Sequence, residues 1–78
     1  MRMIIVYSKD MCTQCDVTKK SLESKGFDFE VIDVMKDEGA LNKVREMGYT
    51  SMPVVIAGEE HWSGFRPDKI AALQSAMA

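Results

Sequence analysis

The sequence predicts an α/β fold, a four-stranded mixed sheet with three helices on its two faces, in the order β-α-β-α-β-β-α. Three observations lead to this prediction. Short runs rich in β-branched residues alternate with amphipathic segments of helical length, the first three elements have the length of a strand–helix–strand crossover, and a hairpin pattern precedes the last helix. With 78 residues, the chain is expected to form one domain over residues 1–78.

The first half of the chain predicts a strand, a helix and a second strand. Residues 3–7 are an apolar run typical of a strand buried on both faces, and residues 8–11 turn out of it. Residues 12–25 predict a helix, and residues 27–34 alternate apolar with acidic side chains as a strand does. A crossover of this length makes the two strands parallel. The expected inner face of the helix consists of Val17, Thr18, Ser21 and Leu22.

The second half predicts a helix, a hairpin and a final helix. Residues 37–47 form the helix, residues 54–62 the antiparallel hairpin, and Pro67 with Asp68 begins the last helix. Pro53 stands at the start of the hairpin, where a missing N–H is tolerated. The expected core positions of the two helices are Ala40, Leu41, Val44 and Met47 in the first, and Ile70, Leu73 and Met77 in the second.

Composition excludes several classes of function. The hydrophobic content of 46% and charged content of 28% are ordinary for a soluble domain, and the net charge of −2 argues against nucleic-acid binding. No apolar run approaches the ~20 residues that a membrane span needs. The apolar N-terminus lacks a small-residue cleavage site, so it predicts a strand instead of a signal peptide. We therefore expect a cytoplasmic protein. We also expect it to act as a monomer.

Cys12-Thr13-Gln14-Cys15 is the strongest functional signal, and it contains both cysteines of the chain. Residues three apart share a helix face, so the two sulfurs can form a disulfide. A helix N-terminus stabilises a thiolate, which favours Cys12 as the reactive cysteine and leaves Cys15, one turn in, as the more buried resolving thiol. The alternative is half of a zinc or iron–sulfur site. His61 is the only other soft ligand, so a metal site needs a second chain.

Other candidate residues each have a structural alternative. Met11 and Met52 suit a surface that meets varied partners, although methionines also fill gaps in a core. Trp62 and Phe65 are candidates for an exposed partner-binding patch, and their alternative is burial in the core.

The element order is that of the thioredoxin fold, and a Cys-x-x-Cys beside a βαβ pattern points to the same fold. The chain then resembles the NrdH-redoxins along nearly its whole length. The resemblance is carried by Cys12-Thr13-Gln14-Cys15, by Lys25-Gly26-Phe27-Asp28-Phe29-Glu30, by Met52-Pro53-Val54-Val55 and by Trp62-Ser63-Gly64-Phe65-Arg66-Pro67-Asp68. The last of these motifs is the most specific. Thr13 is a departure, because an apolar residue is common there in the family.

The resemblance implies a dithiol electron carrier that donates electrons to class Ib ribonucleotide reductase and is reduced by NADPH-dependent thioredoxin reductase. It implies no bound cofactor, only a reversible Cys12–Cys15 disulfide. It also implies that Cys12 attacks, that Cys15 resolves, that Pro53 is a cis-proline, and that the backbone at Met52 receives the partner peptide. Residues 62–68 would form a hydrogen-bonded loop near the site. The residues expected to contact partners are Met11, Thr13, Gln14, Met52, Pro53, Trp62, Ser63, Gly64 and Phe65.

Two other functions remain open at this point. One is a glutaredoxin reduced by glutathione. The chain has Cys-Thr-Gln-Cys and Ser-Met-Pro where such proteins usually have Cys-Pro-Tyr-Cys and Thr-Val-Pro, and it has the Ser-Gly-Phe-Arg loop where they have a Gly-Gly-x-Asp stretch. These differences weaken the expectation of tight glutathione binding. The other is a dimeric metal-binding or iron–sulfur module that shares cysteines between chains.

Overall fold

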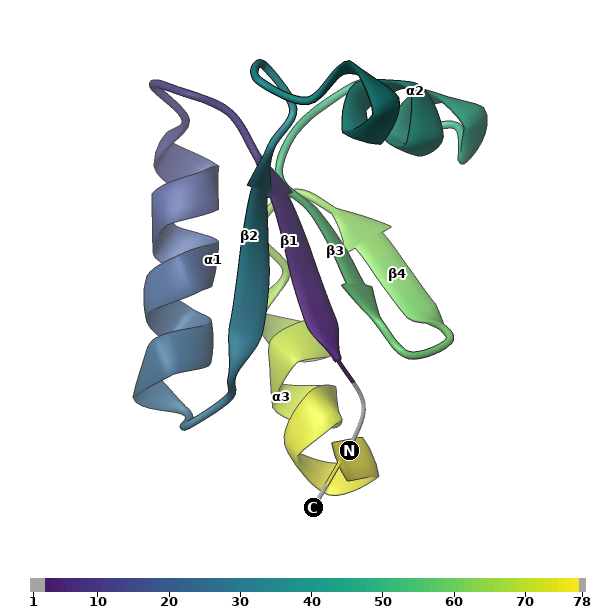
Figure 1. The fold of residues 1–78 in the computed structure, drawn as a ribbon. Helices are drawn as coiled ribbons and strands as arrows, with labels where there is room; N and C mark the ends of the chain where they lie inside the picture. The colour runs from purple at the N-terminus through teal and green to yellow at the C-terminus, as the bar shows by residue number, and fades with distance from the viewer. Residues whose placement is uncertain (1–2, 78) are drawn as a thin grey trace.

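The helices and strands follow the predicted order. The computed structural model describes the backbone of residues 3–77 and the side chains of residues 3–75. Its elements are β1 (Ile4–Ser8), α1 (Thr13–Ser24), β2 (Phe29–Asp33), α2 (Glu38–Glu46), β3 (Val54–Ala57), β4 (Glu60–Ser63) and α3 (Pro67–Met77). The order β-α-β-α-β-β-α of the thioredoxin fold is therefore confirmed (Figure 1). None of the helices within residues 3–77 is long and apolar enough to cross a membrane.

The four strands form one mixed sheet in the order β2-β1-β3-β4. β1 is parallel to β2, as the crossover through α1 requires, whereas β3 is antiparallel to both β1 and β4. The arrows of β1 and β2 point the same way and that of β3 runs against them (Figure 1). β1 lies inside the sheet, which explains its continuous apolar sequence. β2 lies at an edge, so its Val31 remains 44% exposed.

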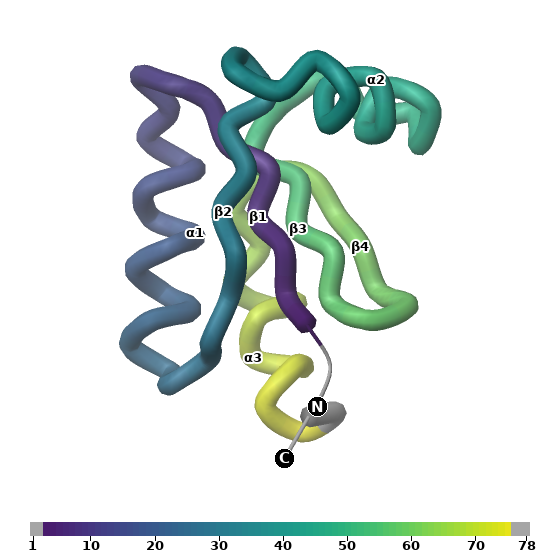
Figure 2. The backbone as a smooth tube through the Cα atoms, viewed as in Figure 1, coloured from purple at the N-terminus to yellow at the C-terminus, as the bar shows by residue number. Residues whose placement is uncertain are grey.

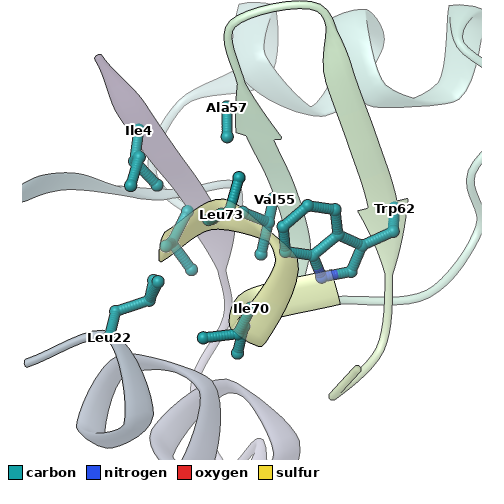
Figure 3. Close-up of a cluster of buried hydrophobic side chains, with 8 residues drawn as sticks. Ile4, Leu22, Val55, Ala57, Trp62, Ile70 and Leu73 are labelled. Carbon is teal, nitrogen blue, oxygen red and sulfur yellow. The ribbon is translucent and has the colours of Figure 1, made fainter. Parts of the chain in front are cut away.

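Helices cover both faces of the sheet, as predicted. α1 and α3 pack on one face, where Leu22, Ile70 and Leu73 meet alternate residues of the strands. Trp62 of β4 joins this cluster with its indole ring beside α3 (Figure 3). α2 packs on the other face through Ala40 and Val44. The side chain of Met77, which was expected in the core, lies outside the described residues.

One expectation for α1 is wrong. Its buried side chains are Cys15, Thr18 and Leu22, whereas Val17 is 38% exposed and faces away from the core. The spacing of three and then four residues follows one side of an α-helix, and it runs directly from the second cysteine. Val17 lies off that line. The helix is therefore rotated so that Cys15 and Thr18 occupy its inner face.

Candidate active site

The two cysteines lie at the C-terminal end of β1, where the chain enters α1. The segment between β1 and α1 shares this end of the sheet with the segment between β2 and α2 (Figure 2). Cys12 is the N-cap of α1, with extended backbone angles of φ −117° and ψ 101°. The backbone N–H of Cys15 donates to the Cys12 sulfur at 3.2 Å. An N–H group of the first helical turn, which has no partner within the helix, therefore points at the Cys12 sulfur.

A disulfide joins Cys12 to Cys15, as the spacing of the motif predicts. Their Cα atoms are 5.2 Å apart, within the usual range for a disulfide. The two ends of this bond lie in different surroundings. Cys15 is fully buried at 0% exposure, whereas Cys12 is partly exposed. An incoming group can therefore reach only the Cys12 side of the bond directly.

The segment before β3 forms a second wall beside Cys12. The Met52–Pro53 peptide bond is cis, in agreement with the resemblance described above. The carbonyl oxygen of Met52 lies 3.7 Å from the Cys12 sulfur. Pro53 is buried and Met52 is half-buried, packed against the cluster beneath α2. The wall next to the Cys12 sulfur is therefore a backbone edge, held in place by the packing of Met52 and Pro53.

The loop after β4 links this wall to the cysteine motif. The N–H of Gly64 donates to the carbonyl of Pro53 at 2.8 Å, and the hydroxyl of Ser63 donates to the carbonyl of Ser51 at 3.0 Å. The N–H of Phe65 donates to the side-chain oxygen of Gln14 at 3.0 Å. Three consecutive residues, the last of β4 and the first two of the loop after it, thus hold both sides of the site in a fixed relation.

Gly64 is required in this loop for two reasons. Its φ of +82° lies in the left-handed region, which glycine adopts without strain. In addition, a Cβ atom at this position would lie 3.2 Å from the side-chain oxygen of Gln14. The approach of the loop to Gln14 therefore depends on the absence of a Cβ atom at Gly64.

The structure separates the candidate partner-binding residues into exposed and buried groups. Met11 is completely exposed and has a positive φ of 54°, and Thr13 and Gln14 are also exposed. The side chain of Trp62 is only 4% exposed and belongs to the core cluster. Burial in the core, the alternative to an exposed partner-binding patch, therefore describes it. Phe65 is half-buried against the same cluster. The exposed residues Met11, Thr13 and Gln14 adjoin Cys12 in the chain, whereas Trp62 lies in the core cluster.

Sequence reasoning missed three contacts near the site. It assigned Gln14 to partner binding without a link to Phe65, it gave Ser51 no role, and it considered His61 only as a possible metal ligand. His61 Nδ1 lies 2.6 Å from the Tyr49 hydroxyl, which connects the segment after α2 to β4. No pattern of spacing signals these pairs, because each joins positions far apart in the sequence.

Arg66 and Asp68 form an ion pair at the start of α3. The Arg66 guanidinium donates to both carboxylate oxygens, at 3.1 and 2.9 Å. These hydrogen bonds hold the pKa of Asp68 below its ordinary value and raise the pKa of Arg66. The carboxylate also lies in the first turn of the helix, where a negative charge is favourable.

No group of three or more histidine, cysteine, aspartate or glutamate side chains suited to a metal ion occurs in the described part of the chain.

Comparisons with known proteins agree with this geometry. The glutaredoxin family model matches residues 4–62. The chain is 47% identical over 73 residues to the glutaredoxin-like protein NrdH of Escherichia coli K12, covering 94% of this chain and 90% of that protein. It is 38% identical over 71 residues to the NrdH of Lactococcus lactis subsp. lactis, covering 91% and 99%.

Solved structures show the same arrangement. NrdH-redoxin from Escherichia coli, a glutaredoxin-like protein with a thioredoxin-like activity profile, superposes with a TM-score of 0.89 at 46% identity, over 91% of this chain and 93% of that one. A glutaredoxin from Archaeoglobus fulgidus gives a TM-score of 0.83 at 31% identity, over 95% and 87%.

Proposed function

We propose, from the premise that this chain belongs to the glutaredoxin family and to its NrdH group, that it carries electrons from thioredoxin reductase to class Ib ribonucleotide reductase. The chain is a glutaredoxin-like dithiol redox protein whose Cys12–Cys15 pair forms a disulfide. The observation that carries the proposal is the asymmetry of this pair, with one sulfur accessible at a helix N-cap and the other fully buried. The thioredoxin-like activity profile of the Escherichia coli relative supports the choice of reductase.

Cys12 is the attacking residue in this proposal. In the reduced protein its thiolate would be stabilised by the Cys15 N–H and by the positive end of α1. The thiolate attacks one sulfur of a partner disulfide, forms a Cys12–partner mixed disulfide, and releases the other partner sulfur as a thiolate. That thiolate takes a proton from solvent.

Cys15 is the resolving residue. Its thiol, after losing a proton to solvent, attacks the Cys12 sulfur of the mixed disulfide. The Cys12–Cys15 disulfide forms, and the second partner sulfur leaves as a thiolate. Two electrons have then moved to the partner. Because Cys15 is fully buried on the inner side of α1, it reacts with Cys12 and is shielded from other disulfides.

The backbone edge at Met52 is the proposed docking strip for the partner peptide. Its carbonyl oxygen lies beside the Cys12 sulfur, so an extended peptide that pairs with this edge presents its disulfide to Cys12. Met11, Thr13 and Gln14 form the exposed rim around the same sulfur. Ser63 and Gly64 support the edge at Met52 through their hydrogen bonds to the carbonyls on either side of it, and Phe65 supports the rim through its N–H bond to Gln14.

The cellular setting is part of the proposal. A protein that works as a dithiol reductant needs a reducing compartment, so we place it in the cytoplasm. We also propose that it works as a monomer, because the attacking sulfur, the resolving sulfur and the docking edge all lie in one chain.

A comparison of two reductants tests the proposal. Reduction of a protein disulfide by the purified chain is followed as NADPH consumption, either with thioredoxin reductase or with glutathione and glutathione reductase. The proposal predicts efficient turnover with thioredoxin reductase and little with glutathione. Turnover that occurs only with glutathione and glutathione reductase would identify a glutathione-dependent glutaredoxin instead. A Cys12→Ser variant is the control and should be inactive with both.

A further inference from the structure

Thr18 has a buried hydroxyl that forms no hydrogen bond within the described residues. Its side chain is 0% exposed, and its Oγ1 is one of two buried side-chain polar atoms there without a partner, the other being Trp62 Nε1. A buried hydroxyl without a partner is destabilising and is rare in native proteins. Such an atom calls for a physical explanation.

The position of Thr18 relates it to the resolving cysteine. Cys15, Thr18 and Leu22 are the three buried residues of α1 and form its inner stripe. Side chains three residues apart on a helix are neighbours, with Cβ atoms about 5–6 Å apart. Trp62 belongs to β4 and packs beside α3, so only Thr18 shares a helix face with Cys15.

The redox state of Cys15 decides what its sulfur can offer Thr18. In the disulfide, the Cys15 sulfur is bonded to Cys12 and carries no proton. In the reduced protein, the same sulfur becomes a thiol that is a weak donor or, when ionised, an acceptor. This group remains in a fully buried place, where a polar group needs a partner. A hydroxyl can both donate and accept, so it suits either form of the sulfur.

We propose that Thr18 is a positioning residue for the resolving step, through a hydrogen bond to Cys15 that exists only when the disulfide is open. In the resting reduced protein, the Cys15 thiol donates to Thr18 Oγ1. When Cys15 loses its proton to solvent, the Thr18 hydroxyl donates to the thiolate and holds it toward the Cys12 sulfur. Closure of the disulfide ends this contact and leaves the hydroxyl without a partner. The inference rests on the proposed redox cycle.

A hydrogen bond that exists only in the reduced protein shifts the redox equilibrium toward the reduced form. The Thr18 hydroxyl has a hydrogen-bond partner in the reduced protein and none in the oxidised protein, so Thr18 favours the reduced form. Replacement by valine, which has the same shape but no hydroxyl, removes this preference. We therefore expect Thr18→Val to make disulfide formation more favourable by about tenfold, the order of one hydrogen bond. For a two-electron couple, this factor is about 30 mV toward a more negative potential.

The first measurement is the equilibrium of the protein with mixtures of oxidised and reduced dithiothreitol, read by alkylation of free thiols and mass spectrometry. Thr18→Val should be more oxidised than the natural protein at each ratio, and Thr18→Ser should match the natural protein. Equal equilibria for the valine variant and the natural protein would overturn the inference. Urea unfolding of both redox forms is the control, since a merely structural role shifts both forms equally.

The second measurement separates the two chemical steps. Reduced protein is mixed with an excess of a chromogenic aromatic disulfide, which releases one coloured thiolate when Cys12 attacks and a second when Cys15 resolves. Thr18→Val should slow the second release several-fold and leave the first unchanged. Equal slowing of both steps contradicts a role specific to Cys15. If even the natural protein releases only one thiolate, the proposed redox cycle fails. If it releases both and the valine variant matches it, only the role of Thr18 fails.

Discussion

Cys12 and Cys15 are three residues apart, yet their surroundings give them different chemistry. The Cys12 sulfur accepts from the Cys15 N–H in the first turn of α1 and lies beside the Met52 carbonyl, whereas Cys15 is fully buried. This difference follows from helix geometry, because the N-cap lies outside the helix and the third helical residue faces the sheet. At the scale of single residues, the site therefore consists of one accessible sulfur and one protected sulfur.

Gln14 provides the first residue-scale prediction. Gln14→Met keeps the length of the side chain but removes the oxygen that accepts from the Phe65 N–H. We expect the variant to lose about 0.5–1.5 kcal/mol in the free energy of unfolding, measured in urea. Hydrogen exchange at the Phe65 amide should accelerate. Gln14→Glu retains an acceptor oxygen and is the control. Unchanged exchange in the methionine variant would show that this hydrogen bond does not protect the loop.

Gly64 provides a second prediction with a matched control in the same chain. Gly64 and Gly26 have similar positive φ values of 82° and 81°, but only a Cβ at Gly64 would meet Gln14. Alanine at either position should cost about 1–2 kcal/mol of stability through the left-handed backbone. Only Gly64→Ala should also accelerate exchange at the Phe65 amide and reduce turnover. Similar turnover in both variants would exclude a role for the close approach.

The helix termini were predictable from the sequence, because their signals are local. Asp37 caps α2 by accepting from the Ala40 N–H at 3.0 Å, and Pro67 begins α3 where the sequence places it. The rotation of α1 was not predictable in the same way. Val17 looked like a core residue by type, but the inner stripe starts at Cys15, and only packing against the sheet reveals which side is buried.

The ion pair at the start of α3 gives a pH-dependent prediction. The hydrogen bonds from Arg66 lower the pKa of Asp68 in the folded state, so the carboxylate stabilises the fold above the ordinary aspartate value of about 4. This contribution is lost as the pH falls through the lowered folded-state pKa. Asp68→Asn should therefore be less stable than the natural protein near neutral pH, and the difference should disappear in strong acid.

Thermal unfolding at a series of pH values measures this difference. Because both side chains are largely exposed, we expect a small effect that added salt weakens. A difference between the two proteins that grows as the pH falls would contradict the assigned sign.

The whole molecule is organised by two clusters on opposite faces of one sheet. The sequence could predict this layering, since the first strand is a continuous apolar run, which indicates burial on both faces, and each helix has an apolar side. It could not predict the link between Gln14 and Phe65, which are 51 positions apart, or the pairing of Tyr49 with His61. Such contacts depend on how loops meet once the sheet has formed.

Leu22 tests the larger cluster at this scale. It is fully buried and packs α1 toward the sheet and α3. Leu22→Ala should lose about 2–5 kcal/mol, a large part of the ~5–15 kcal/mol typical of a whole domain. Val17→Ala, on the exposed side of the same helix, should change stability by less than about 0.5 kcal/mol. Urea unfolding measures both, and equal losses would contradict the observed rotation of α1.

The central claim is that Cys12 attacks and Cys15 resolves, and trapping the mixed disulfide tests it most directly. Reduced Cys15→Ser and Cys12→Ser variants are each mixed with a disulfide-bonded protein substrate, and adducts are identified by mass spectrometry without reductant. The structure predicts that Cys15→Ser accumulates a stable adduct through Cys12, while Cys12→Ser forms little, because Cys15 is buried. An adduct through Cys15 that forms as readily as the one through Cys12 would contradict the account.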